Sequence, residues 1–285
     1  MLSYRHAFHA GNHADVLKHI VWIEILSYLS KKDKAFYVHD THAGAGTYAI
    51  DSDMMQKRQE YLSGIAGLYN YAGECDEIRR YVEVIRGFNQ PDTLETYPGS
   101  PLITKALLRE QDRMCVTDLH GSDIPLLRRA LGRDRRIKVK QMDAYEGLLS
   151  MLPPHEKRGA TLIDPSYEIK KEYTILPQKV GHALTKFPNG VFAIWYPVLR
   201  RSDTESFIRQ LDAILRSKNQ ANPLSALRIE FNVEPDREDG FGMVGSGMYV
   251  INPPYVLEPV MAKVLPILNQ QLTGGKGRVF LDANK

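Results

Sequence analysis

The chain has 285 residues, 43% of them hydrophobic and 25% charged, which is typical of a globular protein with one large or two small domains. Its longest apolar runs, such as 190–196, are far shorter than the roughly 18 residues that span a bilayer. The N-terminus has no apolar run and no cleavage site, and Cys75 and Cys115 are too few for a disulfide framework. We therefore expect a cytoplasmic protein with no membrane segment.

The formal net charge of +3 does not by itself indicate a nucleic-acid partner, but the positive charge is unevenly placed. Seven lysines and arginines fall within residues 128–140. Such a run is most often a solvated face, and it is also the pattern of a surface that binds phosphates. Both interpretations stay open at this point.

Apolar residues at helical spacing predict an amphipathic helix over 13–31. A β-rich run at 35–40 ends in Asp40 and is followed by a turn of small residues. Polar helices are predicted at 56–70 and 74–88, with no strand signal between 51 and 96. We interpret 51–96 as an inserted helical subdomain and assign residues 1–50 and 97–285 to the main domain.

After residue 97, β-rich runs alternate with helical patterns, which predicts an α/β fold with a mostly parallel sheet. Strands are expected at 113–118, 137–143, 159–164, 190–197, 226–233 and 247–252. Helices are expected at 122–131, 144–152, 176–186, 203–216 and 255–271. No clear helix separates the last two strands, so we expect them to form an antiparallel edge.

Four predicted strands in succession end in an aspartate: Asp40, Asp118, Asp143 and Asp164. One such aspartate is usually the N-cap of the next helix, but four in order predict a ligand-binding rim at the carboxyl ends of the strands.

The turn with Gly44 and Gly46 allows the backbone to approach a cofactor, although it lacks the third glycine of the dinucleotide fingerprint. Asp118 is placed to bind ribose hydroxyls, and Asp143 with Ala144 to hold an adenine edge.

Two similar motifs, IDPSY at 163–167 and INPPY at 251–255, are each suited to holding a nucleobase. In the first, Asp164 and the carbonyl of Pro165 would accept hydrogen bonds from an exocyclic amine, and Tyr167 would stack on the base. Asp164 continues the series of strand-end aspartates, whereas the second motif follows a late strand. We therefore predict that Asp164, Pro165 and Tyr167 are catalytic, with Tyr167 also contacting the substrate.

The series D-x-H-A-G-A-G (40–46), T-D-L-H (117–120), M-D-A (142–144) and D-P-x-Y (164–167) resembles the S-adenosylmethionine-dependent adenine-N6 methyltransferases. The segments 2–19, 97–103, 195–198 and 246–255 are similar to the J-type family that modifies an adenine of 23S ribosomal RNA. This resemblance covers nearly the whole chain. It implies a Rossmann-like class I methyltransferase fold, S-adenosylmethionine as cofactor, and 23S ribosomal RNA as partner, either free or in an early precursor particle.

The resemblance also implies particular contacts. It implies that the cofactor contacts His19, His42, Ser100, Asp118, Asp143, Ala144 and Asp164, and that the RNA contacts Tyr4. Arg5 beside Tyr4 would either clamp RNA or belong to an ordered terminal arm. No metal is expected, because the early histidines lack a supporting cysteine or acid cluster.

The usual motif of such enzymes is D-P-P-Y, and Ser166 replaces its second proline. Because proline fixes φ, we expect a less rigid turn and lower catalytic precision, not a different reaction. Two alternatives remain: a DNA-directed methyltransferase or processing factor in the use of external DNA, and a cofactor-binding protein with impaired turnover.

Overall fold

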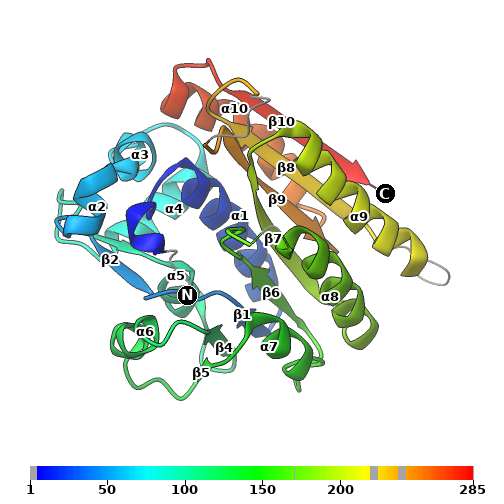
Figure 1. Cartoon of the computed structure of the whole chain (residues 1–285). Coiled ribbons are helices and arrows are strands. Elements are labelled where there is room, and N and C mark those ends of the chain that lie inside the picture. Colours follow the sequence, from blue (N-terminus) through cyan, green and yellow to red (C-terminus); the bar gives the residue numbers. More distant parts are fainter. Residues whose placement is uncertain (1–4, 170, 219–223, 237–241, 285) are drawn as a thin grey trace.

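The computed structural model describes residues 5–169, 171–218, 224–236 and 242–284. Its centre is an eight-stranded sheet in the order β10-β8-β9-β7-β6-β1-β4-β5 (Figure 1). The strands are β1 (Tyr37–Asp40), β4 (Arg113–Asp118), β5 (Ile137–Gln141), β6 (Gly159–Ile163), β7 (Val191–Val198), β8 (Ala226–Asn232), β9 (Gly245–Ile251) and β10 (Arg278–Asn284). The first five of these pair in parallel, and β9, β8 and β10 are antiparallel. The predicted mostly parallel sheet is confirmed.

Helices cover both faces of this sheet (Figure 1). They are α1 (His13–Ser30), α5 (Ser100–Leu107), α6 (Asp123–Leu131), α7 (Ala144–Ser150), α8 (Glu172–Lys186), α9 (Arg201–Lys218) and α10 (Leu257–Thr273). The buried apolar residues form two clusters, one with α1 and α10 and the other with α7, α8 and α9. Along β7, Ala193 belongs to the first cluster, and Phe192 and Ile194 belong to the second. This alternation is the two-residue period of a strand that is buried on both sides.

The antiparallel part of the sheet differs from the prediction. The strands β8 and β9 do pair with each other, but β9 lies between β7 and β8, and β10 forms the edge. The strand β10 carries little sequence signal because most of its side chains are exposed. A separate two-stranded ribbon, β2 (Thr47–Ala49) with β3 (Thr96–Pro98), was not predicted either.

The segment 51–96 contains α2 (Asp53–Arg58), the 3-10 helix η2 (Glu60–Ser63), α3 (Ile65–Leu68) and α4 (Asp76–Arg86). It contributes no strand to the eight-stranded sheet, but its last residue begins β3 in the ribbon. Buried residues of α4, such as Tyr81 and Ile85, share a hydrophobic cluster with α1. The segment therefore packs on the common core, and its role as an inserted subdomain stays a prediction.

Helix α1 is buried along almost its whole length, from His13 to Leu26. The amphipathic helix predicted for this segment is thus covered on all sides, because α4, α5, α10 and the sheet surround it. Five of its buried side chains are polar or charged and need partners there: His13, Asp15, Lys18, His19 and Glu24. Within the described ranges, no helix has the combination of length and apolar character that crossing a membrane requires.

Candidate active site

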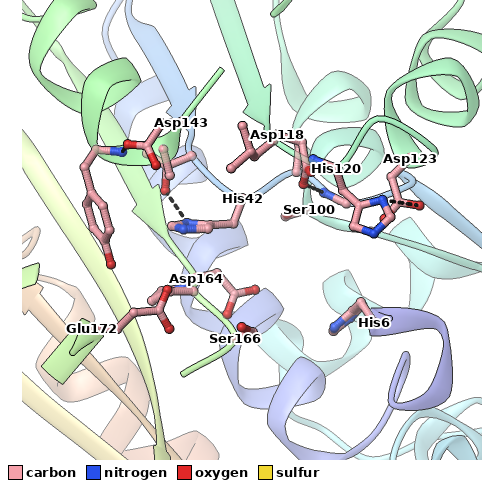
Figure 2. A pocket seen from close by; sticks show the side chains of 18 of the residues that line it. His6, His42, Ser100, Asp118, His120, Asp123, Asp143, Asp164, Ser166 and Glu172 are labelled. Carbon is pink, nitrogen blue, oxygen red and sulfur yellow. Dashed lines mark hydrogen bonds and ion pairs between the residues drawn. The ribbon is translucent and has the colours of Figure 1, made fainter. Parts of the chain in front are cut away.

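A cavity of about 380 Å³ opens at the carboxyl ends of the parallel strands. This volume lies within the range of roughly 300–1,000 Å³ that is typical of small-ligand sites. The lining includes nine of the residues predicted from the sequence: His19, His42, Gly44, Ser100, Asp118, Asp143, Ala144, Asp164 and Pro165. Figure 2 shows the side chains of Asp118, Asp143 and Asp164 around one space, although they come from three separate strand ends.

Asp118, the last residue of β4, holds the glycine turn against the cavity. Its Oδ2 accepts a hydrogen bond from the backbone N–H of Gly44 at 2.8 Å, and its Oδ1 accepts one from the N–H of His120 at 2.7 Å. Gly44 has a φ of 57°, and a Cβ there would lie 2.6 Å from the Tyr48 hydroxyl. Only glycine fits this position without strain. The turn and the carboxylate therefore form one preorganised wall.

Gly46 is not among the residues that line this cavity, and its predicted contact with the cofactor stays a prediction. Its φ is 79°, and an added Cβ would lie 2.9 Å from Cδ1 of Leu127 on α6. Its carbonyl accepts a hydrogen bond from the N–H of Gly99 at 2.9 Å. Gly46 thus shapes the turn and allows α6 to pack closely.

Asp143 combines the two roles considered for a strand-end aspartate. Its Oδ1 caps helix α7 by accepting from the N–H groups of Tyr145 at 2.9 Å and Glu146 at 3.0 Å. The side chain also lines the cavity, next to buried Ala144. Across from it, the Nδ1 of His42 is 2.7 Å from the Thr41 hydroxyl, and burial lowers the pKa of His42. A neutral imidazole therefore borders the cavity at neutral pH.

Polar groups beneath the cavity are deeply buried. Burial raises the pKa of Asp40 to about 7, and its Oδ2 accepts a hydrogen bond from Ser100 Oγ at 2.6 Å. His19 contacts the Tyr97 hydroxyl through Nδ1 at 2.7 Å, and burial lowers its pKa to about 3. The Nε2 of His19 and the Oδ1 of Asp40 are buried with no hydrogen-bond partner in the described structure. These two buried atoms could therefore form hydrogen bonds with polar groups of a ligand.

Lys18 and Asp15, which the sequence analysis did not identify, complete the site. The Nζ of Lys18 lies 2.6 Å from Asp15 Oδ1 and 2.6 Å from Asp164 Oδ2. Asp15 also accepts from His6 Nε2 at 2.9 Å and from the N–H of Gly11 at 2.8 Å. The available signal was an acid and a lysine three residues apart in an otherwise apolar helix. Only the fold shows that this pair is buried.

A second cavity, of about 690 Å³, adjoins the first. Both cavities are lined by His6, Lys18, Asp164 and Ser166. The predicted catalytic motif thus forms the boundary between two separate spaces.

Tyr167 lines the second cavity but is only 6% exposed. Its hydroxyl donates to the carbonyl of Trp195 at 2.8 Å, and its ring centroid lies 4.6 Å from that of Tyr173. Its φ of 54° is unusual for a non-glycine residue and is a form of strain found at functional sites. The ring is held within an aromatic cluster in this conformation, and its stacking on a base stays a prediction.

Arg5 is bound to the protein surface, as an ordered terminal arm would be. Its Nη1 donates to Ser122 Oγ at 2.7 Å and to Asp123 Oδ1 at 2.8 Å. Asp123 lines the first cavity, so this contact anchors the N-terminal segment beside the cavity mouth. Tyr4 lies outside the described residues, and both predicted RNA contacts remain predictions.

The second motif, INPPY, lies at the opposite end of the sheet. Because β9 is antiparallel to β7, its last residue, Ile251, pairs with Phe192 near the start of β7. Asn252 donates from Nδ2 to the carbonyls of Pro188 at 2.7 Å and Gly190 at 2.8 Å. These bonds give Asn252 a structural role in the turn that follows β9.

Three of the early histidines each contact a different side chain instead of facing one shared metal position. His6 contacts Asp15, His9 contacts Glu60 at 3.0 Å, and His19 contacts Tyr97. Among the residues that the structure describes, no group of three or more histidines, cysteines and acids is arranged to hold a metal ion.

Residues 33–282 match the family described as ribosomal RNA large subunit methyltransferase D, RlmJ. The chain belongs to this family. RlmJ-family membership confirms the resemblance predicted from the motifs and makes S-adenosylmethionine the cofactor of this methyltransferase.

Individual relatives agree with this assignment. The chain is 45% identical to ribosomal RNA large subunit methyltransferase J of Escherichia coli, over 95% of this chain and 94% of that protein. It is 44% identical to the protein of the same name from Haemophilus influenzae, with the same coverage. A crystal structure of a Legionella pneumophila protein, 34% identical, superposes with a TM-score of 0.87 over 97% of this chain and 99% of that one. The RlmJ fold is therefore shared over essentially the whole chain.

Proposed function

We propose that this protein transfers a methyl group from S-adenosylmethionine to the exocyclic N6 amine of an adenine in 23S ribosomal RNA. The observation that carries the proposal is the meeting of two cavities at Asp164 and Ser166, in the D-P-x-Y motif. One cavity suits the cofactor and the other suits a base taken out of its stack. The names of the relatives, which specify the RNA of the large ribosomal subunit, support the choice of RNA.

The first cavity fits the cofactor by the chemistry of its lining. Carboxylates at Asp118 and Asp143 suit ribose hydroxyls and an exocyclic adenine amine, and the glycine turn allows close approach. The unpartnered Nε2 of His19 offers a further polar contact. When bound, S-adenosylmethionine supplies a methyl group made electrophilic by the positive charge on its sulfur.

Asp164 and Pro165 would activate the substrate amine. The amine is a poor nucleophile because its lone pair is delocalised into the purine ring. A carboxylate and a backbone carbonyl that accept its two hydrogens favour a tetrahedral nitrogen with a free lone pair. When the nitrogen takes the methyl group, the bond from that methyl to the sulfonium sulfur would break and the sulfur would leave as a neutral thioether. The nitrogen would then lose one of these protons, and Asp164 would pass that proton to solvent.

Lys18 would orient Asp164. Its ammonium group lies 2.6 Å from Oδ2, and the Lys18 side chain is only 4% exposed. This contact occupies one carboxylate oxygen and leaves the other for the amine. A carboxylate that is held by an ammonium group is better suited to act as a fixed hydrogen-bond acceptor than as a strong base.

The two alternatives from the sequence are less well supported. The relatives are named for ribosomal RNA and not for DNA, which disfavours a DNA-directed enzyme. Loss of turnover through Ser166 is also less well supported, because Asp164 and Pro165 line the first cavity and Lys18 contacts Asp164.

The proposal is tested by incubating the protein and S-adenosylmethionine with unmodified 23S ribosomal RNA, an early precursor particle and duplex DNA. Nucleoside mass spectrometry should detect N6-methyladenosine in at least one of the two RNA samples and none in DNA. Methylation of DNA alone, or of another base, would contradict the proposal. The comparison of the two RNA samples also identifies the preferred form of the substrate.

A further inference from the structure

The sheet has a second rim at the amino ends of its parallel strands, opposite the two cavities. We call it the amino rim and define it by residues 31–36, 108–113, 132–136, 151–158, 186–190 and 252–256. These segments contain eleven lysines and arginines and five acidic residues. The whole chain has a net charge of only +3, so the positive charge is concentrated on this rim.

Two arginines fix the shape of the amino rim. Arg109 Nη1 donates to the carbonyls of Ser30 at 3.0 Å and Lys32 at 2.7 Å. Arg158 Nη1 donates to the carbonyl of Lys34 at 2.8 Å. The backbone of 30–34 is therefore held in place, while the side chains of Lys32 and Lys34 are exposed.

Tyr255 stands on the same rim and is 78% exposed, more than any other large hydrophobic side chain in the described part of the chain. Its ring contacts Tyr28 edge to face, with 5.7 Å between centroids and an angle of 87°. The two hydrogen bonds of Asn252 fix the turn that precedes it. An aromatic ring is thus exposed to solvent on the rim that carries the excess of positive charge.

We propose that the amino rim is a second RNA-binding surface, on which Tyr255 stacks on an unpaired base and exposed lysines and arginines contact phosphates. Exposed aromatic rings beside positive charge are the usual means of binding single-stranded RNA. The inference rests on the proposed RNA substrate and extends it to RNA beyond the target adenine. A membrane surface is less suitable, because interfacial binding uses an amphipathic helix with several apolar side chains. Among the described residues of the rim, Tyr255 is the one exposed large hydrophobic side chain.

Part of the basic run 128–140 belongs to this surface or continues it. Arg133 and Arg135 are exposed on the amino rim, and Lys138 and Lys140 are exposed on the outermost strand, β5. They extend the positive surface from the rim towards the cavities. Arg136 differs, because it pairs with Asp134 at 2.6 Å and donates to the carbonyl of Leu108 at 2.5 Å. Arg136 is therefore structural and is left unchanged in the test.

The test compares Tyr255→Ala with Tyr255→Phe, which keeps the ring, in methylation of a long 23S RNA fragment. Loss of one stacked base costs about 1–3 kcal/mol, so Tyr255→Ala should raise KM by about 5- to 140-fold with kcat unchanged. Tyr255→Phe should match the wild type. A short hairpin that carries only the target adenine should show no effect of either change, because it does not reach the amino rim.

A second variant, Lys32→Ala with Lys34→Ala, tests the phosphate contacts. For single-stranded RNA, the slope of log affinity against log salt should fall by about 1.4 if both lysines contact phosphates. A matched control, Lys179→Ala with Arg209→Ala on α8 and α9, should leave the slope unchanged.

The outcomes separate this inference from the proposed function. If the wild type methylates no RNA, the proposed function fails. If it methylates the long fragment and both amino-rim variants behave as wild type, the second surface alone is refuted. Binding to anionic phosphatidylserine vesicles that depends on Lys32 and Lys34, with RNA affinity unchanged in the variants, would assign the rim to a membrane and overturn the inference.

Discussion

The ammonium group of Lys18 lies 2.6 Å from Oδ2 of Asp164, although the two residues are 146 positions apart. The same group lies 2.6 Å from Asp15 Oδ1, within a helix that is buried on all sides. Burial opposes the charge on Lys18, but the carboxylates of Asp15 and Asp164 more than offset it and raise the pKa of Lys18. Asp15, although also buried, has a pKa well below its usual value because His6 and Lys18 are close. The three charges therefore form one buried unit at the boundary of the cavities.

Removing the ammonium group should therefore damage both stability and activity. Lys18→Met leaves two carboxylates without their partner, and breaking a buried ion pair typically costs about 3–5 kcal/mol. We expect the free energy of unfolding in urea to fall by that amount and methyl transfer to fall by at least about 100-fold. Lys179→Met, on α8 and outside both cavities and the amino rim, is the control. Wild-type stability of Lys18→Met would show that the unit does not hold the fold.

Asp118→Ala should weaken binding of S-adenosylmethionine. Hydrogen bonds to a charged group contribute about 1.5–3 kcal/mol, so the dissociation constant from calorimetry should rise by about 10- to 150-fold. Asp33→Ala, on the amino rim, should bind as the wild type does. Unchanged affinity in a folded Asp118→Ala protein would remove Asp118 from the cofactor site.

Asp40 should make stability depend on pH. Burial raises its pKa to about 7, above the usual value of 3.8, so the folded protein holds a proton that the unfolded chain releases. Its contribution is most favourable below about pH 4 and is lost as the pH rises towards 7. Asp40→Asn, which keeps an acceptor for Ser100, should gain stability relative to the wild type over this range, by on the order of 4 kcal/mol at pH 8. Parallel curves of unfolding free energy against pH for the two proteins would refute this account.

Ser166→Pro should keep or raise the turnover number. The substitution restores the stiffer turn of the usual motif at the boundary of the two cavities, where Ser166 is partly buried. Ser166→Ala removes the hydroxyl without adding the ring and separates the two effects. A large loss of activity in both variants would mean that the Ser166 hydroxyl itself takes part in the reaction.

The sequence predicted an element correctly where its local hydrophobic pattern matches its burial in the fold. The strand 113–118 was found at its observed bounds because its residues from Met114 to Thr117 are buried on both faces and read as one β-rich run. The rim of aspartates was also predictable, since the ends of parallel strands must converge at one edge.

Contacts between distant segments were not predictable from local pattern. The local sequence around Lys18 does not distinguish it from other helical lysines, because its partner Asp164 follows a strand far along the chain. The exposed strand β10 has no buried face to impose an alternating pattern. The role of Tyr167 was assigned from its motif, whereas its burial depends on Tyr173 and Phe207 from later helices.

The most direct test of the active site compares Asp164→Ala with Asn252→Ala, the same substitution in the two similar motifs. Both proteins are incubated with S-adenosylmethionine and unmodified 23S ribosomal RNA, and N6-methyladenosine is measured by mass spectrometry. Loss of a catalytic hydrogen-bonding group typically costs about 100- to 1,000-fold in rate. We predict that Asp164→Ala abolishes measurable transfer and that Asn252→Ala stays close to the wild type. Loss of transfer in a folded, cofactor-binding Asn252→Ala protein, with transfer retained in Asp164→Ala, would contradict the account.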